Sequence, residues 1–544
     1  MSRFFSSAIN DLIVKCKFAC PQKVRLYSLR SSRFLRRNLP RNCLHVYQQS
    51  RGVRTAVRSL FASFKSTKLR FWILGVGAGS VLALGIKDHV YVGSECEEKT
   101  AREHIRNGGF DGAVKVSRDL LQRIKVQDEV GAPGIVVGVS VDGVPVWSEG
   151  LGYADLENRV PCRAGSVMRI ASISKSLTTT AAARLWEQGL LDLDVPVQKY
   201  VPEFPEKEFE GKPVTITTRM LLSHLSGIRH YEKDSKKVRE EKETTKRPPG
   251  SPGRLHKEDK GVDGKEKNND VKKKETGPGR KKREFEQEEY YLKQNFDSVV
   301  QALELFKNDP LVFKPGTTFL YSTHAFTLLS AVVERAAGQR FLDHMTQMFR
   351  DLGMLNTMAE ENDPIIYHRS RFYHRNKKGR IVNCPYVDNS YKWAGGGFLS
   401  TVGDLLLFGD AMLYSYQMAH MKDEEELLPG FLKPQTAAMV WAPVDKTEGS
   451  WDKDGRYGMG WLVVEKHQEY GQCRKRRHYI SHTGGAVGAS SVLLVLPKEP
   501  QETPNEVLAP PRGVVVAVLI NMQSVGLNGT ALKIAQEFDK ATRD

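Results

Sequence analysis

Residues 169–191 read RIASISKSLTTTAAARLWEQGLL, with Ser172 and Lys175 three positions apart just before an apolar helical run. Residues at positions i and i+3 share one face of a helix. Ser172 would then lie at the helix N-terminus, where unpaired backbone N–H groups favour developing negative charge. The pair is either a nucleophile with its base or part of an ordinary helix that Ser172 or Ser174 caps.

Nucleophilic chemistry sets conditions on both residues. A serine hydroxyl is a poor nucleophile unless a base removes its proton. A lysine acts as that base only if desolvation lowers its pKa, and the apolar helix after Lys175 could bury it. Because Ser-x-x-Lys also occurs by chance, the pair needs support from other motifs.

Two further motifs follow in the chain. Tyr321, in KPGTTFLYSTHAFTLLSAVVERAAG, lies between a Pro-Gly turn and an amphipathic helix. A phenol beside a lysine can shuttle protons between nucleophile and leaving group, and a core tyrosine is the alternative. The segment HYISHTGGAVGASSVLLVLP places His482, Thr483, Gly484 and Gly485 before a strand. Such glycines let substrate lie against the strand edge, where a backbone N–H can donate to an oxyanion, and a Gly-rich turn is the alternative.

The two ends of the body carry strand patterns. Asp142-Gly143 between two β-rich runs predicts a hairpin, after a helix over Ala113–Gln127. Near the C-terminus, Ser490–Pro497 and Gly513–Met522 predict strands, and TALKIAQEFDKATR predicts a closing helix. Helical patterns fill the middle. We therefore expect an α+β fold, in which an antiparallel sheet built from both chain ends is flanked by helices and carries a mostly helical inserted domain.

The order Ser-x-x-Lys, Tyr-Ser-x, basic-Thr-Gly resembles the serine β-lactamase and penicillin-binding-protein family. The segments LLSHLSGI (Leu221–Ile228) and WAGGGFLSTVGDLLLF (Trp393–Phe408) are similar to stretches of its class C and esterase-like branch. The resemblance extends from about Gly134 to the C-terminus and is interrupted by a charged insertion.

The resemblance implies a role for each matched residue. Ser172 would be the acylated nucleophile, Lys175 the base or its activator, and Tyr321 the proton shuttle. The backbone N–H groups of Ser172 and Gly485 would form the oxyanion hole. The residues that would bind the substrate or its oxyanion are Thr323, His482, Thr483, Gly484 and Gly485.

Two positions depart from the family's pattern. The third residue of the Tyr motif is often Asn, and Thr323 is shorter and has no N–H donor. The lysine of the family's Lys-Thr-Gly motif is His482 here, which is mostly neutral near pH 7. Both changes favour an ester or peptide substrate over an anionic β-lactam. No carboxylate base for deacylation is evident.

The positive charge is concentrated at the N-terminus. The chain has 544 residues and a net charge of +17, and residues 1–70 hold sixteen Lys or Arg and one acidic residue, Asp11. The remainder is nearly neutral, which argues against a nucleic-acid binder. A basic, Ser-rich, acid-poor head is typical of a mitochondrial transit region, and a disordered basic arm is the alternative.

An apolar segment follows the head. Phe71–Ile86 contains no charged residue, and it is marginal for a membrane span, which needs about 20 residues. We predict a membrane or sorting segment over 71–88 and a hydrolase domain over 95–544 that faces the intermembrane space. With these two segments, the chain is similar to an animal mitochondrial branch of the family. That similarity implies a link to mitochondrial lipid metabolism and an ability to form filaments.

The body contains one stretch of different composition. Residues 233–286 are mostly Lys, Glu, Asp, Gly and Pro, and we expect them to be disordered because so few apolar residues cannot offset the ordering entropy. The seven cysteines show no CxxC or Cys/His ligand spacing, so we predict no metal site and no disulfide framework.

The sequence therefore predicts a serine hydrolase, either peptidase or esterase, that needs no cofactor. The expected partners are a peptide or ester substrate, copies of the same chain in a homo-oligomer or filament, and the inner membrane. The alternative is a self-assembling scaffold of the intermembrane space with little or no catalysis. The two hypotheses differ in the effect expected of Ser172→Ala: a hydrolase would lose its activity, whereas a scaffold would still assemble.

Overall fold

The computed structural model describes residues 109–126, 131–233, 238–240, 289–420, 428–448, 452, 454–468, 475–498 and 510–542. These residues belong to one compact unit, Ser94–Asp544. The predicted transit region and apolar segment lie outside the described residues, and so does nearly all of the predicted insertion 233–286. None of the helices in the described part of the chain combines the length and apolar character that a membrane crossing requires.

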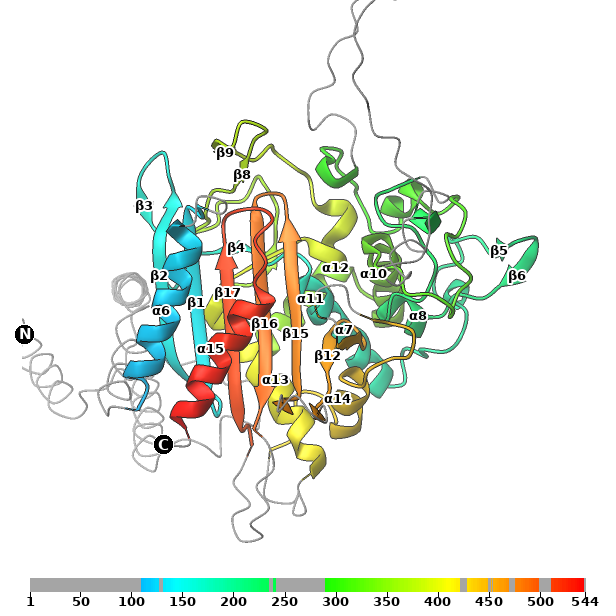
Figure 1. The fold of residues 1–544 in the computed structure, drawn as a ribbon. Helices are drawn as coiled ribbons and strands as arrows, with labels where there is room; N and C mark the ends of the chain where they lie inside the picture. Colours follow the sequence, from blue (N-terminus) through cyan, green and yellow to red (C-terminus); the bar gives the residue numbers. More distant parts are fainter. Residues whose placement is uncertain are drawn as a thin grey trace, which may run out of the picture. The chain divides into compact units, whose positions relative to one another are not determined.

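In the described part of the chain, eight strands form an antiparallel sheet (Figure 1). From one edge to the other they are β11 (Gly455–Tyr457), β12 (Leu462–Val464), β15 (Tyr479–Ala486), β16 (Ala489–Pro497), β17 (Gly513–Ile520), β1 (Gly134–Val141), β2 (Val144–Asp155) and β3 (Val160–Pro161). The first strand therefore lies beside the last, with Ile135 opposite Ile520. The predicted sheet built from both chain ends is confirmed.

The hairpin between β1 and β2 follows from its turn residues. Asp142 and Gly143 have φ angles of 49° and 77°. Two consecutive positive φ angles match the right-handed twist of the strands, and Asp-Gly tolerates them. Every residue of β1, β16 and β17 is buried, because helices cover both faces of the sheet. These strands therefore consist of continuous apolar runs.

In the described residues, α6 (Asp111–Val126), α15 (Asn528–Ala541) and α13 (Val402–Gln417) cover the two faces of the sheet (Figure 1). On one face α6 and α15 share a core with side chains such as Val137 and Val518. On the other face α13 packs against β1, β16 and β17. Gly138 of β1 allows this approach, because a Cβ there would meet Val402 at 3.1 Å.

The second face of the sheet continues into a mostly helical region, as predicted. Its α-helices are α7 (Ile173–Glu187), α8 (Thr218–Leu222), α10 (Thr323–Ala337), α11 (Phe341–Asp351), α12 (Trp393–Gly396) and α14 (Pro434–Val440). Its 3₁₀ helices are η1 (Val197–Lys199), η2 (Glu289–Tyr291), η3 (Gln301–Leu305), η4 (Ser390–Lys392) and η5 (Met418–His420).

Further short strands lie outside the main sheet. They form the small sheets β4 (Met168–Arg169) with β10 (Phe398–Ser400) and β7 (Met358–Ala359), β5 (Lys207–Phe209) with β6 (Lys212–Val214), β8 (Tyr373–Arg375) with β9 (Ile381–Asn383), and β13 (His467–Gln468) with β14 (Lys475–Arg476). Because β4 and β10 pair immediately before α7 and α13, they fix the starts of both helices. Helix α7 contacts β15 and β16, and this contact brings the Ser172 turn to the sheet edge.

Candidate active site

The turn that carries Ser172 is shaped by a strained residue. Ala171 has a φ of +47°, a left-handed conformation that costs a non-glycine residue about 1–2 kcal/mol. Ser172 then occupies the N-cap position of α7, but its side chain makes no capping hydrogen bond. Ser322, by contrast, caps α10 by accepting a hydrogen bond from the backbone N–H of Ala325 at 3.1 Å. The Ser322 hydroxyl therefore stabilises the start of α10, whereas the Ser172 hydroxyl is available to a different group.

That group is the amine of Lys175, one turn further along α7. Its Nζ lies 3.2 Å from Oγ of Ser172, 2.6 Å from the carbonyl oxygen of Gly395 and 3.4 Å from Oγ1 of Thr323. The side chain is 0% exposed, and no carboxylate among the described residues pairs with it. Burial, and then the charge of Lys392, hold the pKa of Lys175 well below its usual value. A neutral amine at this distance can accept the serine proton.

Tyr321 contacts both members of the pair. Its ring centroid lies 4.7 Å from Nζ of Lys175. Burial raises the pKa of the phenol, and a hydrogen bond with Ser172 opposes that shift. The phenol is therefore protonated at neutral pH and can donate to an atom beside Ser172. The buried ring of His224 packs 4.3 Å from the Tyr321 ring and holds it in place.

A cavity of about 230 Å³ opens beside Ser172. The predicted site residues that line it are Ser172, Tyr321, Thr323, Thr483 and Gly485. The other lining residues are Ala171, His230, Tyr231, Tyr290, Lys392, Gly395, Gly396 and Ala486. The structure thus brings the three predicted motifs together around Ser172, with lining residues from other segments of the chain beside them. Lys175 is not among the described residues that line the cavity.

The edge of β15 borders this cavity. Strand β12 pairs with β15 only over Tyr479–Ser481, so no strand in the described part of the chain pairs with that edge beyond Ser481. A Cβ added to Gly485 would meet nothing within 4 Å. The backbone from Thr483 to Gly485 is therefore accessible to a bound molecule, as an extended substrate would require.

Two predicted substrate contacts are not supported by this arrangement. His482 is fully buried, and neither it nor Gly484 is among the described residues that line the cavity. Burial, and then Lys175, lower the pKa of His482 to about 3, so the ring is neutral. Its Nε2 lies 2.8 Å from the Tyr457 hydroxyl. Because side chains alternate along a strand, Thr483 and Gly485 reach the cavity while His482 and Gly484 face away from it.

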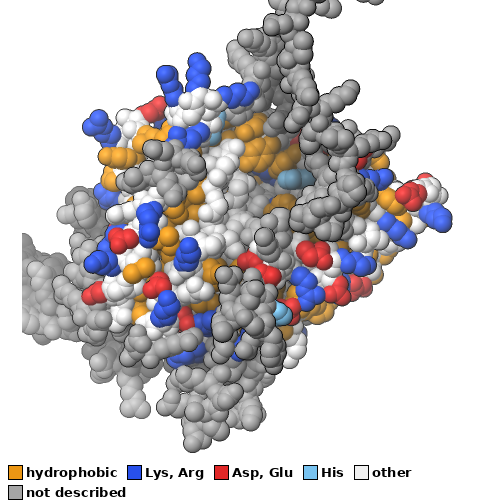
Figure 2. Space-filling view, in the orientation of Figure 1, with side chains coloured by type: hydrophobic (Ala, Val, Ile, Leu, Met, Phe, Trp, Pro, Cys, Tyr) orange, Lys and Arg blue, Asp and Glu red, His pale blue; other side chains and the backbone are white. Residues whose placement is uncertain are grey.

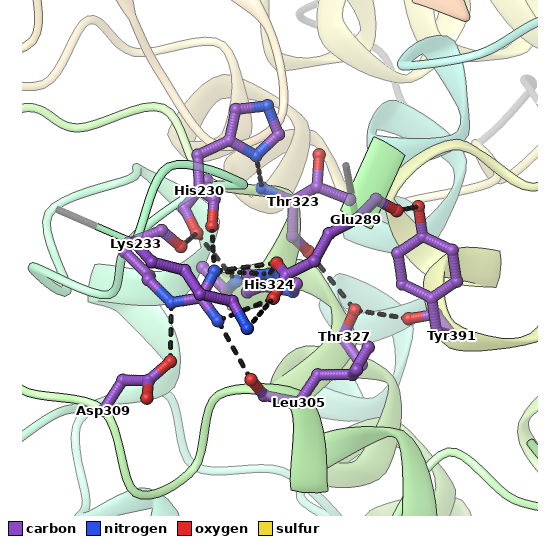
Figure 3. A network of polar contacts seen from close by, with 12 residues as sticks. His230, Lys233, Glu289, Leu305, Asp309, Thr323, His324, Thr327 and Tyr391 are labelled. Carbon is purple, nitrogen blue, oxygen red and sulfur yellow. Dashed lines mark hydrogen bonds and ion pairs between the residues drawn. The ribbon is translucent and has the colours of Figure 1, made fainter. Parts of the chain in front are cut away.

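A buried polar network supports the wall of the cavity (Figure 3). Arg229 bonds both carboxylate oxygens of Glu289, at 2.8 and 3.0 Å, and Nε2 of His324 lies 2.8 Å from the same carboxylate. Arg229 precedes the predicted insertion and Glu289 follows it, so this ion pair joins the two ends. The adjacent His230 accepts a hydrogen bond from the backbone N–H of Thr323 at 3.3 Å. The network therefore positions the start of α10, which carries the Tyr321 motif.

Sequence reasoning missed His230 and three further residues of the cavity. Tyr231 and Tyr290 come from opposite ends of the predicted insertion, and their rings meet edge to face with centroids 5.5 Å apart. Lys392 directly precedes the WAGGG segment and lines the cavity with them. No local pattern marks any of the three, because their neighbours in space are far away in the sequence.

Comparison with known proteins identifies chains that are similar in sequence. The sequence profile of the family described as "Beta-lactamase" matches residues 122–536. "Serine beta-lactamase-like protein LACTB, mitochondrial" of Mus musculus is 62% identical over 453 residues, which are 80% of this chain and 82% of the mouse protein. The Homo sapiens protein of that name is 63% identical over 447 residues, 80% of this chain and 81% of the human protein.

A solved structure shares the fold at lower identity. "EstCE1, a hydrolase with promiscuous acyltransferase activity" matches with a TM-score of 0.53 and 21% identity, over 78% of this chain and 99% of that one. At this identity the match is evidence for the fold alone.

Proposed function

The chain belongs to the beta-lactamase family, and we propose that it is a serine hydrolase that cleaves an ester or peptide bond through an acyl-enzyme on Ser172. The observation that carries the proposal is the contact between Lys175 and Ser172. The lysine is completely buried, its pKa is depressed, and its Nζ lies 3.2 Å from the serine hydroxyl. A buried lysine without an ionic partner destabilises a fold, so packing alone does not account for this arrangement.

The proposed reaction uses residues that contact one another or line the same cavity. Ser172 Oγ attacks the substrate carbonyl while its proton passes to Lys175, and the backbone N–H groups of Ser172 and Gly485 donate to the oxyanion. The leaving group takes a proton from Tyr321, which Lys175 reprotonates. No carboxylate is among the described residues that line the cavity. The same Lys175–Tyr321 pair would therefore activate water to release the acyl group.

The open edge of β15 favours a peptide over a simple ester. An extended peptide can add to an unpaired strand edge through backbone hydrogen bonds. The backbone from Thr483 to Gly485 offers such an edge beside Ser172. Neither Thr483 nor Gly485 carries a bulky side chain that would block it.

Labelling with a fluorophosphonate, which acylates activated serines, tests the proposed nucleophile. We expect mass spectrometry of the purified chain to find the label on Ser172. The label should be absent in Ser172→Ala, strongly reduced in Lys175→Met and unchanged in the control Ser148→Ala, an exposed serine. Unlabelled Ser172 in folded protein would refute the proposal.

We also propose that the chain acts in the mitochondrial intermembrane space, in a reaction linked to lipid metabolism. The mouse and human relatives are both named mitochondrial, and the basic residues 1–70 have transit-region composition. Protease protection in isolated mitochondria tests this location, because an intermembrane-space protein becomes accessible once the outer membrane is ruptured.

Association with the inner membrane is supported by the β8–β9 hairpin. Residues 375–380 read RNKKGR, which has four basic residues and no acidic residue. Figure 2 shows Lys and Arg side chains gathered over these strands. Anionic lipid surfaces attract such clusters by about 1 kcal/mol per charge. Co-sedimentation with anionic vesicles, compared with neutral vesicles and with Lys377→Glu/Lys378→Glu, tests this part.

Self-assembly is the second candidate function, and it can coexist with catalysis. Ile365 and Tyr367 are 87% and 81% exposed, which is unusual for large apolar side chains so close together. A second copy of the chain would cover them. If Ile365→Asp/Tyr367→Asp sediments as the wild type does, these residues do not mediate assembly.

A further inference from the structure

His224, in the segment Leu221–Ile228, binds the backbone on both sides of Tyr321. Its carbonyl oxygen accepts a hydrogen bond from the backbone N–H of Leu320 at 2.9 Å. Nδ1 of its ring accepts a second hydrogen bond, from the backbone N–H of Ser322 at 3.2 Å. One residue therefore fixes the two peptide groups between which Tyr321 is held.

The imidazole also contacts the side chain of Tyr321. The two ring centroids lie 4.3 Å apart, with an angle of 42° between the ring planes. The rings of Phe326 and Tyr457 lie 5.2 and 5.0 Å from the imidazole and surround it. The Tyr321 hydroxyl, at the far end of its ring, forms a hydrogen bond with Ser172. Because only two torsions join a tyrosine ring to its backbone, fixing the backbone and the ring also fixes the hydroxyl.

The hydrogen bond from Ser322 determines where the imidazole carries its proton. A backbone N–H can only donate, so Nδ1 of His224 is unprotonated and the proton lies on Nε2. Nε2 has no hydrogen-bond partner among the described residues. Burial is the main cause that holds the pKa of His224 well below its usual value, so the ring is neutral.

Two features of His224 lower the stability of the fold. Its φ angle is +58°, in the left-handed region that disfavours residues with a Cβ. Its buried Nε2–H lacks a partner among the described residues, which is also unfavourable. A leucine or phenylalanine would fill the same apolar surroundings without an unpaired N–H. Packing alone therefore does not account for a histidine here, whereas the acceptor that it gives to Ser322 does.

We propose that His224 is a positioning residue that fixes the Tyr321 hydroxyl beside Ser172, so that the phenol can protonate a poor leaving group. This inference rests on the proposed function, because it assigns how the same site delivers a proton. As the bond between the substrate carbonyl carbon and the leaving-group oxygen breaks, that oxygen takes the phenol proton. Lys175, which holds the proton from Ser172, then reprotonates Tyr321. A nitrophenolate leaves without a proton, whereas an alkoxide does not.

Acetate esters that differ only in their leaving group test the inference. We would measure kcat/KM for 4-nitrophenyl, phenyl and trifluoroethyl acetate, in order of rising leaving-group basicity. Asn and Gly both tolerate a left-handed φ, but of the two only Asn offers an oxygen to the Ser322 N–H. We expect His224→Gly to lower kcat/KM for trifluoroethyl acetate by about 10- to 100-fold and for 4-nitrophenyl acetate by less than about threefold. His224→Asn should keep the wild-type ratio of the two rates.

Two further variants separate positioning from a loss of folded protein. Tyr321→Phe should give the limiting ratio of the two rates, and adding His224→Gly to it should not change that ratio further. The control His478→Gly removes another histidine whose Nε2 lacks a partner among the described residues, and it should keep the wild-type ratio. A purely structural role for His224 would lower both rates in the same proportion.

An unchanged ratio in folded His224→Gly would overturn the inference and leave the hydrolase proposal intact. Should His224→Gly not fold, NMR of the wild type labelled with ¹⁵N-histidine decides, with the His224 signals assigned by their loss in His224→Asn. We expect an unprotonated Nδ1 at pH 7, and a proton on Nδ1 would overturn the inference. If Ser172→Ala hydrolysed all three esters as fast as the wild type, the hydrolase proposal would fail, and this inference with it.

Discussion

Nζ of Lys175 lies 3.2 Å from Oγ of Ser172 while its side chain is wholly shielded from solvent. The carbonyl oxygen of Gly395, at 2.6 Å, supplies the acceptor that keeps the amine in place. A neutral amine needs only such a neutral acceptor, whereas an ammonium group would require a carboxylate. The surroundings of Lys175 therefore fit a base rather than a structural cation.

Replacing Lys175 by Met should separate catalysis from folding. Met fills a similar volume but cannot accept a proton, so we expect kcat to fall by about 10²- to 10⁴-fold. The melting temperature should stay the same or rise, because the replacement removes a buried polar group. Hydrolysis of an activated ester and calorimetric melting measure the two effects. A variant that lost activity only in proportion to lost folded protein would contradict the assigned role.

The rate should also depend on pH through the same lysine. Burial and then Lys392 lower the pKa of Lys175, and the reaction needs the neutral amine, so kcat/KM should fall as pH drops through that pKa. Lys392→Met removes the neighbouring charge, which raises the pKa of Lys175 and moves this acid limb to higher pH. A neutral ester should be the substrate, so that anion binding does not contribute. The control is Lys378→Met, at an exposed lysine. If the acid limb lay at the same pH in Lys392→Met and in this control, Lys175 and Lys392 would not be coupled.

The adjacent glycines 484 and 485 should respond in opposite ways to Ala. A Cβ on Gly484 would lie 2.1 Å from Oγ of Ser491 and 2.4 Å from the carbonyl oxygen of Ile170, so Gly484→Ala should lower the free energy of unfolding by about 1–3 kcal/mol. A Cβ on Gly485 would meet nothing within 4 Å. Gly485→Ala should therefore keep its stability and lose affinity for substrate, seen as a raised KM. Equal melting temperatures for the two variants would contradict the strand orientation.

Local sequence signals predicted much of this structure. The positive φ angles of Asp142 and Gly143 and the position of Ser172 before α7 both depend on a few neighbouring residues, and both match the sequence-based expectation. The contact between Ser172 and Lys175 follows from helix periodicity. Because side chains alternate along β15, His482 and Thr483 cannot both face the cavity.

The rest of the site depends on contacts between distant segments. Tyr231 and Tyr290 lie at opposite ends of the insertion, and they meet where the ion pair between Arg229 and Glu289 joins those ends. Lys392 lies beside them because η4 packs against α10. None of these residues stands in a periodic or motif context that indicates a site, so single-sequence reasoning had no means of finding them.

The ion pair between Arg229 and Glu289 should make the protein sensitive to acid. Burial raises the pKa of Glu289, but hydrogen bonds from His324 and Arg229 outweigh that effect and lower it to about 2, from 4.5. As the pH falls, Glu289 therefore takes up its proton at a higher pH in the unfolded chain than in the folded one. The stabilisation is present above pH 4.5 and is lost as pH falls toward 2, a loss of about 3 kcal/mol.

Glu289→Gln should remove this dependence and expose the energetic role of the pair. At pH 7 we expect the free energy of unfolding to fall by about 3–5 kcal/mol, because Arg229 stays buried and Asp309 is the one carboxylate partner left to it among the described residues. Denaturant unfolding at pH 7, 5 and 3.5 measures both the loss and its slope. The control Glu203→Gln breaks an exposed pair with Arg335 and should change stability by less than about 1 kcal/mol. If Glu289→Gln kept the acid slope of the wild type, other carboxylates would carry it, and the network around Arg229 would not be what holds the two ends of the insertion together.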